Sequence, residues 1–117
     1  MPAPRKPAIP PLERRQRADR DVTAIIDHYL EESAEVALEF VAAFGAACDF
    51  IARNPGLGSP RYAHELNLPG LRHWHCGNFP YLVFYMEHAT RIDIWRVLHA
   101  QRDIPRWMRE DTPQPPG

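Results

Sequence analysis

The sequence predicts an α+β domain in which a two-helix hairpin packs on a small, mostly antiparallel sheet and a short helix follows. Two segments between residues 21 and 53 have apolar residues at helical spacing, and three segments between residues 71 and 98 read as strands. At 117 residues and 44% hydrophobic content, the chain has room for one core. We expect this domain at residues 12–109, with Pro-rich tails at residues 1–11 and 110–117.

The first helix is predicted over residues 21–32 and the second over residues 34–53. The apolar stripe of the first helix consists of Val22, Ile25, Ile26, Tyr29 and Leu30. The stripe of the second consists of Val41, Phe44, Cys48 and Ile51, with Ala37, Phe40 and Ala47 beside it. Ser33 is expected to cap the second helix, and Asn54-Pro55-Gly56 to end it. Because almost nothing joins the two helices, they form an antiparallel hairpin.

Three strands are predicted at residues 71–77, 81–87 and 91–98, as a meander. The second is apolar on both faces, which suits a central strand. Simple alternation in the third would place Ile92, Ile94, Arg96 and Leu98 on one face. One edge strand is expected between residues 8 and 17. Residues 55–70 are expected to form a loop that leads into the sheet, and Asp103 starts a last helical turn.

The formal net charge of −1 gives the molecule no overall field toward nucleic acid or membrane. Basic residues concentrate near the two ends of the chain, whereas acidic residues concentrate in residues 21–49. No apolar run reaches the length of a membrane span, and the N-terminus lacks the apolar region of a signal peptide. We therefore expect a reduced, cytoplasmic protein.

A metal site is the first chemical possibility. His73 and His75 alternate on one strand, and His99 offers a third imidazole. However, no carboxylate or cysteine stands at a spacing that would complete the site. We expect solvated histidines, with no bound metal and no cofactor.

Metal-independent nuclease chemistry is the second possibility. It needs a base, an acid and cations around a phosphate. Those types are present as Arg72, His73, Tyr85, Arg96, His99 and Arg102. The alternative is that Arg72 and Arg96 pair with acidic groups, and that Tyr85 belongs to the core.

A protein-binding surface is the third possibility. Three tryptophans lie on or beside one small sheet, and exposed tryptophan next to arginine is typical of a binding hot spot. The candidate binding residues are Arg72, Trp74, Tyr81, Trp95, Arg96, His99, Arg102 and Trp107.

Several motifs in order make the chain recognisable. They are Asn54-Pro55-Gly56-Leu57-Gly58-Ser59, Pro69-Gly70-Leu71-Arg72, Asn78-Phe79-Pro80-Tyr81-Leu82-Val83-Phe84-Tyr85, Ile94-Trp95-Arg96-Val97-Leu98-His99 and Arg102-Asp103-Ile104-Pro105. Over about residues 12–109, the chain resembles the ParE branch of the RelE/ParE superfamily. These proteins are the toxins of type II toxin–antitoxin modules, often called plasmid stabilisation proteins.

The resemblance implies a helical hairpin on a small antiparallel sheet, which the residue patterns also predict. It implies growth arrest by inhibition of DNA gyrase and no enzymatic activity. It also implies neutralisation by a ParD-like antitoxin in a hetero-oligomeric complex, without sequence-specific nucleic-acid binding by this chain. The arginines at positions 91, 96, 102, 106 and 109 predict that the covering antitoxin segment is acidic.

Two alternatives to the ParE function stay open. RelE-type relatives cut mRNA in the ribosome, using cationic side chains of the sheet and usually a tyrosine near the C-terminus. Here Leu82 stands where RelE-type nucleases carry an arginine, and Trp107 stands near the C-terminus in place of the tyrosine. Arg102 matches an arginine that both branches share. If the chain were such a nuclease, His73, His99 and Arg102 would be the catalytic residues. The other alternative is a non-toxic binding module on the same fold.

Overall fold

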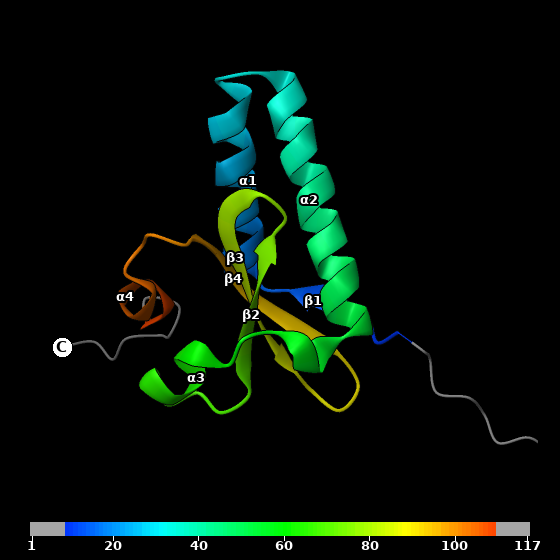
Figure 1. The fold of residues 1–117 in the computed structure, drawn as a ribbon, viewed down its shortest axis with the longest axis vertical. Coiled ribbons are helices and arrows are strands. Elements are labelled where there is room, and N and C mark those ends of the chain that lie inside the picture. Colours follow the sequence, from blue (N-terminus) through cyan, green and yellow to red (C-terminus); the bar gives the residue numbers. More distant parts are fainter. Residues whose placement is uncertain (1–8, 110–117) are drawn as a thin grey trace, which may run out of the picture.

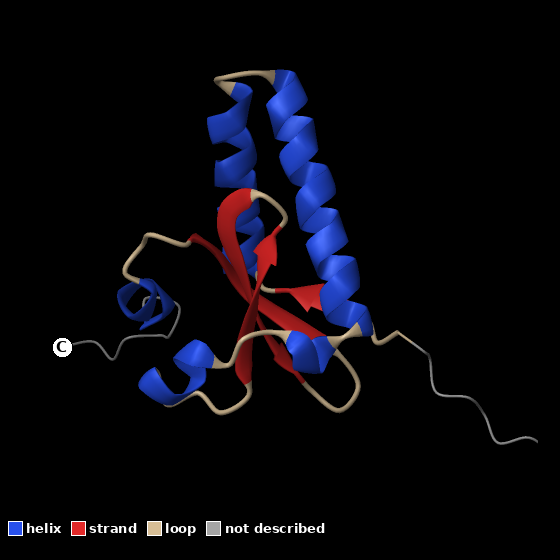
Figure 2. Cartoon of the chain, in the orientation of Figure 1, coloured by secondary structure: helices blue, strands red, loops and turns tan. Residues whose placement is uncertain are grey.

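The computed structural model describes residues 9–109 and confirms the α+β fold (Figures 1 and 2). The elements in chain order are β1 (Leu12–Arg14), α1 (Gln16–Leu30), α2 (Ala34–Arg53), η1 (Pro55–Leu57), α3 (Arg61–Glu65), β2 (Leu71–Cys76), β3 (Phe79–Glu87), β4 (Ile92–His99) and α4 (Ile104–Arg109). Apart from residues 9–11, the predicted tails lie outside the described residues.

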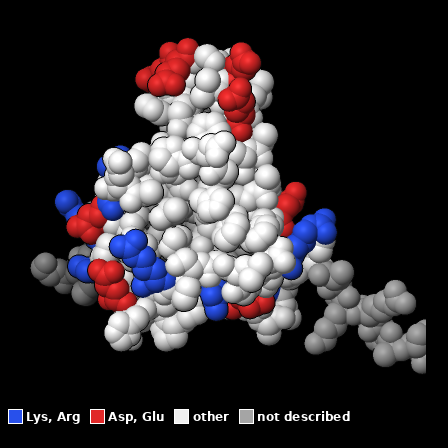
Figure 3. All heavy atoms as spheres, in the orientation of Figure 1, with Lys and Arg blue, Asp and Glu red and all other residues white. Residues whose placement is uncertain are grey.

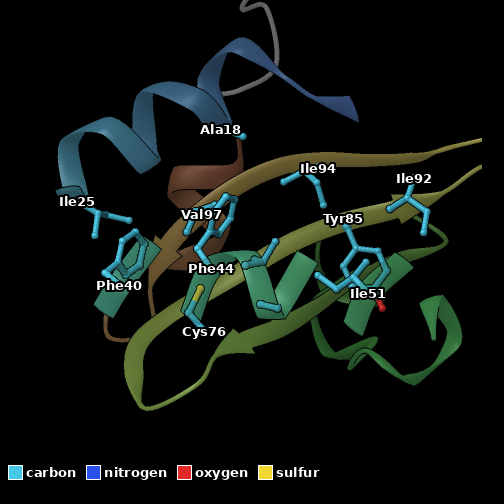
Figure 4. Close-up of a cluster of buried hydrophobic side chains, with 12 residues drawn as sticks. Ala18, Ile25, Phe40, Phe44, Ile51, Cys76, Tyr85, Ile92, Ile94 and Val97 are labelled. Atoms are coloured by element: carbon cyan, nitrogen blue, oxygen red, sulfur yellow. The ribbon is translucent and has the colours of Figure 1, made fainter. Parts of the chain in front are cut away.

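The sheet has four strands in the order β1-β4-β3-β2. The predicted edge strand is β1, which pairs in parallel with β4, whereas β2, β3 and β4 form the predicted antiparallel meander. The α1–α2 hairpin covers one face of the sheet. The main core lies between the hairpin and the sheet, around Phe40, Ile51 and Tyr85 (Figure 4). A second apolar cluster lies outside this core and joins Leu71, Phe84 and Leu98 of the strands to Ile104 and Met108 of α4.

The helix predictions are corrected in part: α1 ends at Leu30, two residues before the predicted end, and Leu30, expected on the apolar stripe, is 51% exposed. α1 begins at Gln16, five residues before the predicted start at Asp21, because tertiary contacts rather than a capping side chain set its start. The backbone N–H of Arg15 donates to the carbonyl oxygen of Ile94 (3.0 Å), and Ala18 is fully buried. α2 has the predicted bounds, and Ser33 caps it by accepting from the Val36 N–H. Val41, predicted in the core, is instead 45% exposed.

Simple alternation also fails along β4. Phe84 pairs with Arg96 and Tyr85 with Ile94, so Trp95 is the extra residue of a β-bulge. The bulge reverses the faces beyond it. Ile94 and Val97 therefore belong to the main core, whereas Leu98 belongs to the second cluster.

Residues 55–70 form η1 and α3 instead of a continuous loop. Three hydrogen bonds tie η1 to the sheet: the Tyr85 hydroxyl donates to the Pro55 carbonyl (2.6 Å) and accepts from the Gly58 N–H (3.1 Å), and Arg72 donates to the Gly58 carbonyl (2.7 Å). Tyr85 and Arg72 therefore hold η1 and Gly58 against the sheet.

Gly58 gives a test of the close packing between this segment and Tyr85. A Cβ atom at Gly58 would collide with the Tyr85 hydroxyl, whereas a Cβ at Gly56 would meet nothing within 4 Å. We expect Gly58→Ala to lower the free energy of unfolding by about 1–3 kcal/mol in urea titrations. The control, Gly56→Ala, should leave it within about 0.5 kcal/mol. Equal stabilities of the two variants would contradict the proposed close approach.

The cysteines give a second test. Burial raises the pKa of Cys76 to about 12 and that of Cys48 to about 11, from an ordinary value of 9.0. Since the Cys76 thiol ionises first in the unfolded chain, its contribution to stability is complete below pH 9 and is lost as the pH rises toward 12. Over that window Cys76→Ala should flatten the alkaline loss by about 1.4 kcal/mol per pH unit. Parallel stability profiles for the variant and the parent chain would refute this assignment.

Candidate functional site

A pocket of about 460 Å³ lies where α1, the end of β4 and the segment leading into α4 meet. It is lined by Asp21, Ala24, Ile25, His28, Tyr81, Val97, Leu98, His99, Arg102 and Trp107. Four of the eight binding candidates are in this set: Tyr81, His99, Arg102 and Trp107. The sequence brings them together because β3 pairs with β4, with Tyr81 opposite His99.

A buried ion pair supports this pocket. Arg96 is 2% exposed, and its guanidinium donates to both carboxylate oxygens of Asp21, at 2.7 and 2.9 Å. Asp21 also accepts from the Val97 N–H (3.0 Å), and Arg96 donates to the Trp107 carbonyl (2.9 Å). These bonds join α1, β4 and α4 at one point. Arg96, a predicted binding residue, is therefore engaged inside the protein and is largely hidden from a partner.

The exposed side of the pocket is aromatic and cationic. The Tyr81 and His99 rings meet edge to face, with 5.3 Å between their centroids. His99 Nδ1 accepts from the Gln101 N–H (3.1 Å), so its other ring nitrogen remains for a partner. The exposed Arg102 places its guanidinium carbon 4.7 Å from the centre of the Trp107 ring. A carboxylate beside an apolar or aromatic group would fit this combination.

The other predicted binding residues lie elsewhere. Arg72 bonds to the Gly58 carbonyl, and Trp74 stacks on Phe50 with 4.2 Å between ring centroids. Trp95 donates to Asp93 (3.0 Å) and packs under the Arg15 guanidinium at 3.9 Å. The single arginine and tryptophan surface envisaged from the sequence is thus divided among separate places.

The three residues named for nuclease chemistry are not all in one pocket. His99 and Arg102 line it, whereas His73 packs against Tyr62 and Phe84 at centroid distances of 5.6 and 5.3 Å. Burial, with smaller contributions from Arg61 and His75, lowers the pKa of His73 and favours its neutral form. Among the described residues, no group of three or more His, Cys, Asp or Glu side chains could hold a metal ion.

Sequence reasoning missed the contribution of α1 to this pocket. Asp21 and His28 both line the pocket, and no sequence motif singles out either of them. One signal was present: an arginine flanked by apolar residues within a strand needs a buried carboxylate partner. Neither spacing nor periodicity indicated which carboxylate of the chain would supply it.

The ion pair gives a stability prediction. Asp21→Ala would leave the Arg96 charge buried without its carboxylate, so we expect a loss of about 3–5 kcal/mol in the free energy of unfolding. The matched control is Glu13→Ala, which breaks the exposed Arg91–Glu13 pair and should cost less than about 1 kcal/mol. Similar losses from both substitutions in urea titrations would show that the buried pair has no special structural role.

Comparisons with known proteins agree with this architecture. Residues 12–104 match the family model described as the ParE toxin of the type II toxin–antitoxin system parDE. A solved structure of the chromosomal ParDE toxin–antitoxin system from P. aeruginosa is similar in fold. It has a TM-score of 0.65 and 24% sequence identity, over 80% of this chain and 98% of that chain. No curated protein matches. In residues 9–109, no helix is both long and apolar enough to cross a membrane. The chain belongs to the ParE toxin family of type II toxin–antitoxin systems.

Proposed function

We propose that this chain arrests bacterial growth by inhibiting DNA gyrase, and that a ParD-like antitoxin neutralises it by covering the pocket at α1, β4 and α4. The pocket itself is the observation that carries the proposal. It combines an exposed arginine stacked on tryptophan with a tyrosine and histidine pair. The fold similarity to a protein of a ParDE system supports an antitoxin as the partner.

The antitoxin segment is expected to be acidic and to fold on binding. Three exposed arginines, Arg102, Arg106 and Arg109, lie in and just before α4, and Arg102 lies over the Trp107 ring of the pocket. A segment with a carboxylate for Arg102 and an apolar side chain for Trp107 would satisfy both features. The toxin and antitoxin would then form a hetero-oligomer.

The proposed target, gyrase, comes from the resemblance to characterised ParE toxins. A metal-independent mRNA nuclease is the second candidate, because one pocket holds His28, Tyr81, His99 and Arg102, which are residue types for acid–base chemistry around a phosphate. The separate position of His73 removes one of the three residues that this second function was expected to use.

Induced expression in a bacterium tests the proposal directly. The chain is expressed with and without the neighbouring reading frame, while growth, DNA replication and translation are followed. Replication failing first, with rescue by the neighbour, is the expected result. Translation failing first with cleaved mRNA, and loss of that effect in His99→Ala, would favour the nuclease. A chain that never arrests growth would favour the non-toxic binding module.

The antitoxin surface gives a separate prediction. Arg102→Glu should weaken binding of the purified antitoxin by about 10- to 100-fold, because a hot-spot cation is replaced by a charge that repels an acidic segment. Isothermal titration calorimetry measures the affinity. The control is Arg61→Glu, since Arg61 is also exposed and lies 5.1 Å from the ring of its neighbour Tyr62, outside the pocket. An equal effect of both substitutions would contradict the assigned surface.

A further inference from the structure

The outer face of α2 is apolar and lacks a partner among the described elements. Leu38 is 69% and Val41 45% exposed, and Ala42, Gly45 and Ala46 are also exposed. Their spacing of three, four, seven and eight residues from Leu38 places them in one stripe. No side chain from Phe40 to Ala47 is polar. A helix with apolar side chains on its buried and its outer face is typical of one that is covered on both sides.

The stripe has a large residue, Leu38, and a gap at Gly45, which would fit each other across two copies of the helix. A Cβ atom at Gly45 would meet nothing within 4 Å, so the fold of the single chain does not require glycine there. Leu38, seven residues earlier, projects from the same face. In an antiparallel pair of α2 helices with a twofold axis between Val41 and Ala42, Leu38 of each copy would lie opposite Gly45 of the other. Small residues at a crossing allow two helices to approach closely, and a large residue fills the remaining space.

The charges along the hairpin favour the same arrangement. Residues 21–52 contain seven Asp and Glu residues but no Lys or Arg, and the tip carries Glu31, Glu32 and Glu35. The opposite end of the hairpin carries the exposed Arg20 and Arg53. Figure 3 shows only acidic side chains at the hairpin tip, and basic side chains, with some acidic ones among them, on the lower body of the molecule. Asp49 precedes Arg53 by four residues, a spacing at which opposite charges attract.

We propose that the outer face of α2 binds a second copy of this chain, with the two hairpins antiparallel, Leu38 over Gly45, and each acidic tip against the arginines of the other copy's hairpin base. A parallel arrangement would bring the two acidic tips together. An acidic antitoxin segment is a poor occupant for the same reason, since the tip carboxylates would repel it. The second copy supplies both the apolar stripe and the opposite charge at the matching end.

Sedimentation velocity of the full chain, made by cell-free synthesis and measured alone between about 1 and 100 μM, tests the proposal. We expect a concentration-dependent monomer–dimer equilibrium. Gly45→Leu should raise the dimer Kd at least about tenfold. It should leave the helical circular dichroism unchanged, because the added side chain enters open space. The control is Leu57→Gln, an uncharged replacement of a leucine with 63% exposure in η1, outside the α2 stripe, and it should not alter association.

A charge exchange tests the orientation. Arg53→Glu alone should raise the dimer Kd about threefold, and Arg53→Glu combined with Glu32→Arg should return it close to the parent value. Rising salt should weaken the parent dimer. A chain that stays monomeric over the whole range, or a dimer unaffected by Gly45→Leu, would overturn the proposal. Because no antitoxin or gyrase is present, either result leaves the proposed toxin function to be judged separately.

Discussion

The Asp21–Arg96 pair is the constraint on which the arrangement of this protein most depends. Arg96 lies in β4, where most residues are buried. Its charge therefore has to be matched inside the molecule. Asp21 matches it with two hydrogen bonds and takes a third from the backbone of β4. The remaining capacity of the guanidinium is used in part by the carbonyl of Trp107. One buried charge thereby fixes how α1 and α4 sit against the sheet.

The bulge at Trp95 sets the face of the sheet on which Arg96 lies. Without it, alternation would place Arg96 on the same face as Ile92 and Ile94, within the main core. With the bulge, Val97 takes the place in that core, and Arg96 reaches both Asp21 and the carbonyl of Trp107. The same irregularity leaves Trp95 beside Asp93 and Arg15, away from the pocket. This extra residue thus separates Trp95 from Trp107, which lines the pocket, although the sequence had suggested one shared surface for them.

The local part of the fold was readable from the sequence, and the long-range part was not. The bounds of α2 follow from Ser33 at one end and Asn54-Pro55-Gly56 at the other, which are local signals. The strands of the meander follow from their composition. The start of α1 and the folding of residues 55–70 depend instead on Ile94 and Tyr85, which are distant in sequence. The site shows the same limit: Tyr81, His99, Arg102 and Trp107 were named by residue type, but their convergence depends on the β3–β4 register.

The distribution of charge connects the site with the hairpin. The pocket and the start of α4 present arginine and aromatic groups, which suits an acidic segment that folds on binding. The hairpin tip presents carboxylates beside an apolar stripe, which suits a cationic surface. Because the two regions have opposite charge, one partner of uniform charge would not suit both. An antitoxin bound at the pocket and a second copy bound along α2, as proposed, would therefore not compete for the same residues. A dimer of this kind would keep both pockets away from the paired α2 helices, since none of the pocket residues comes from α2.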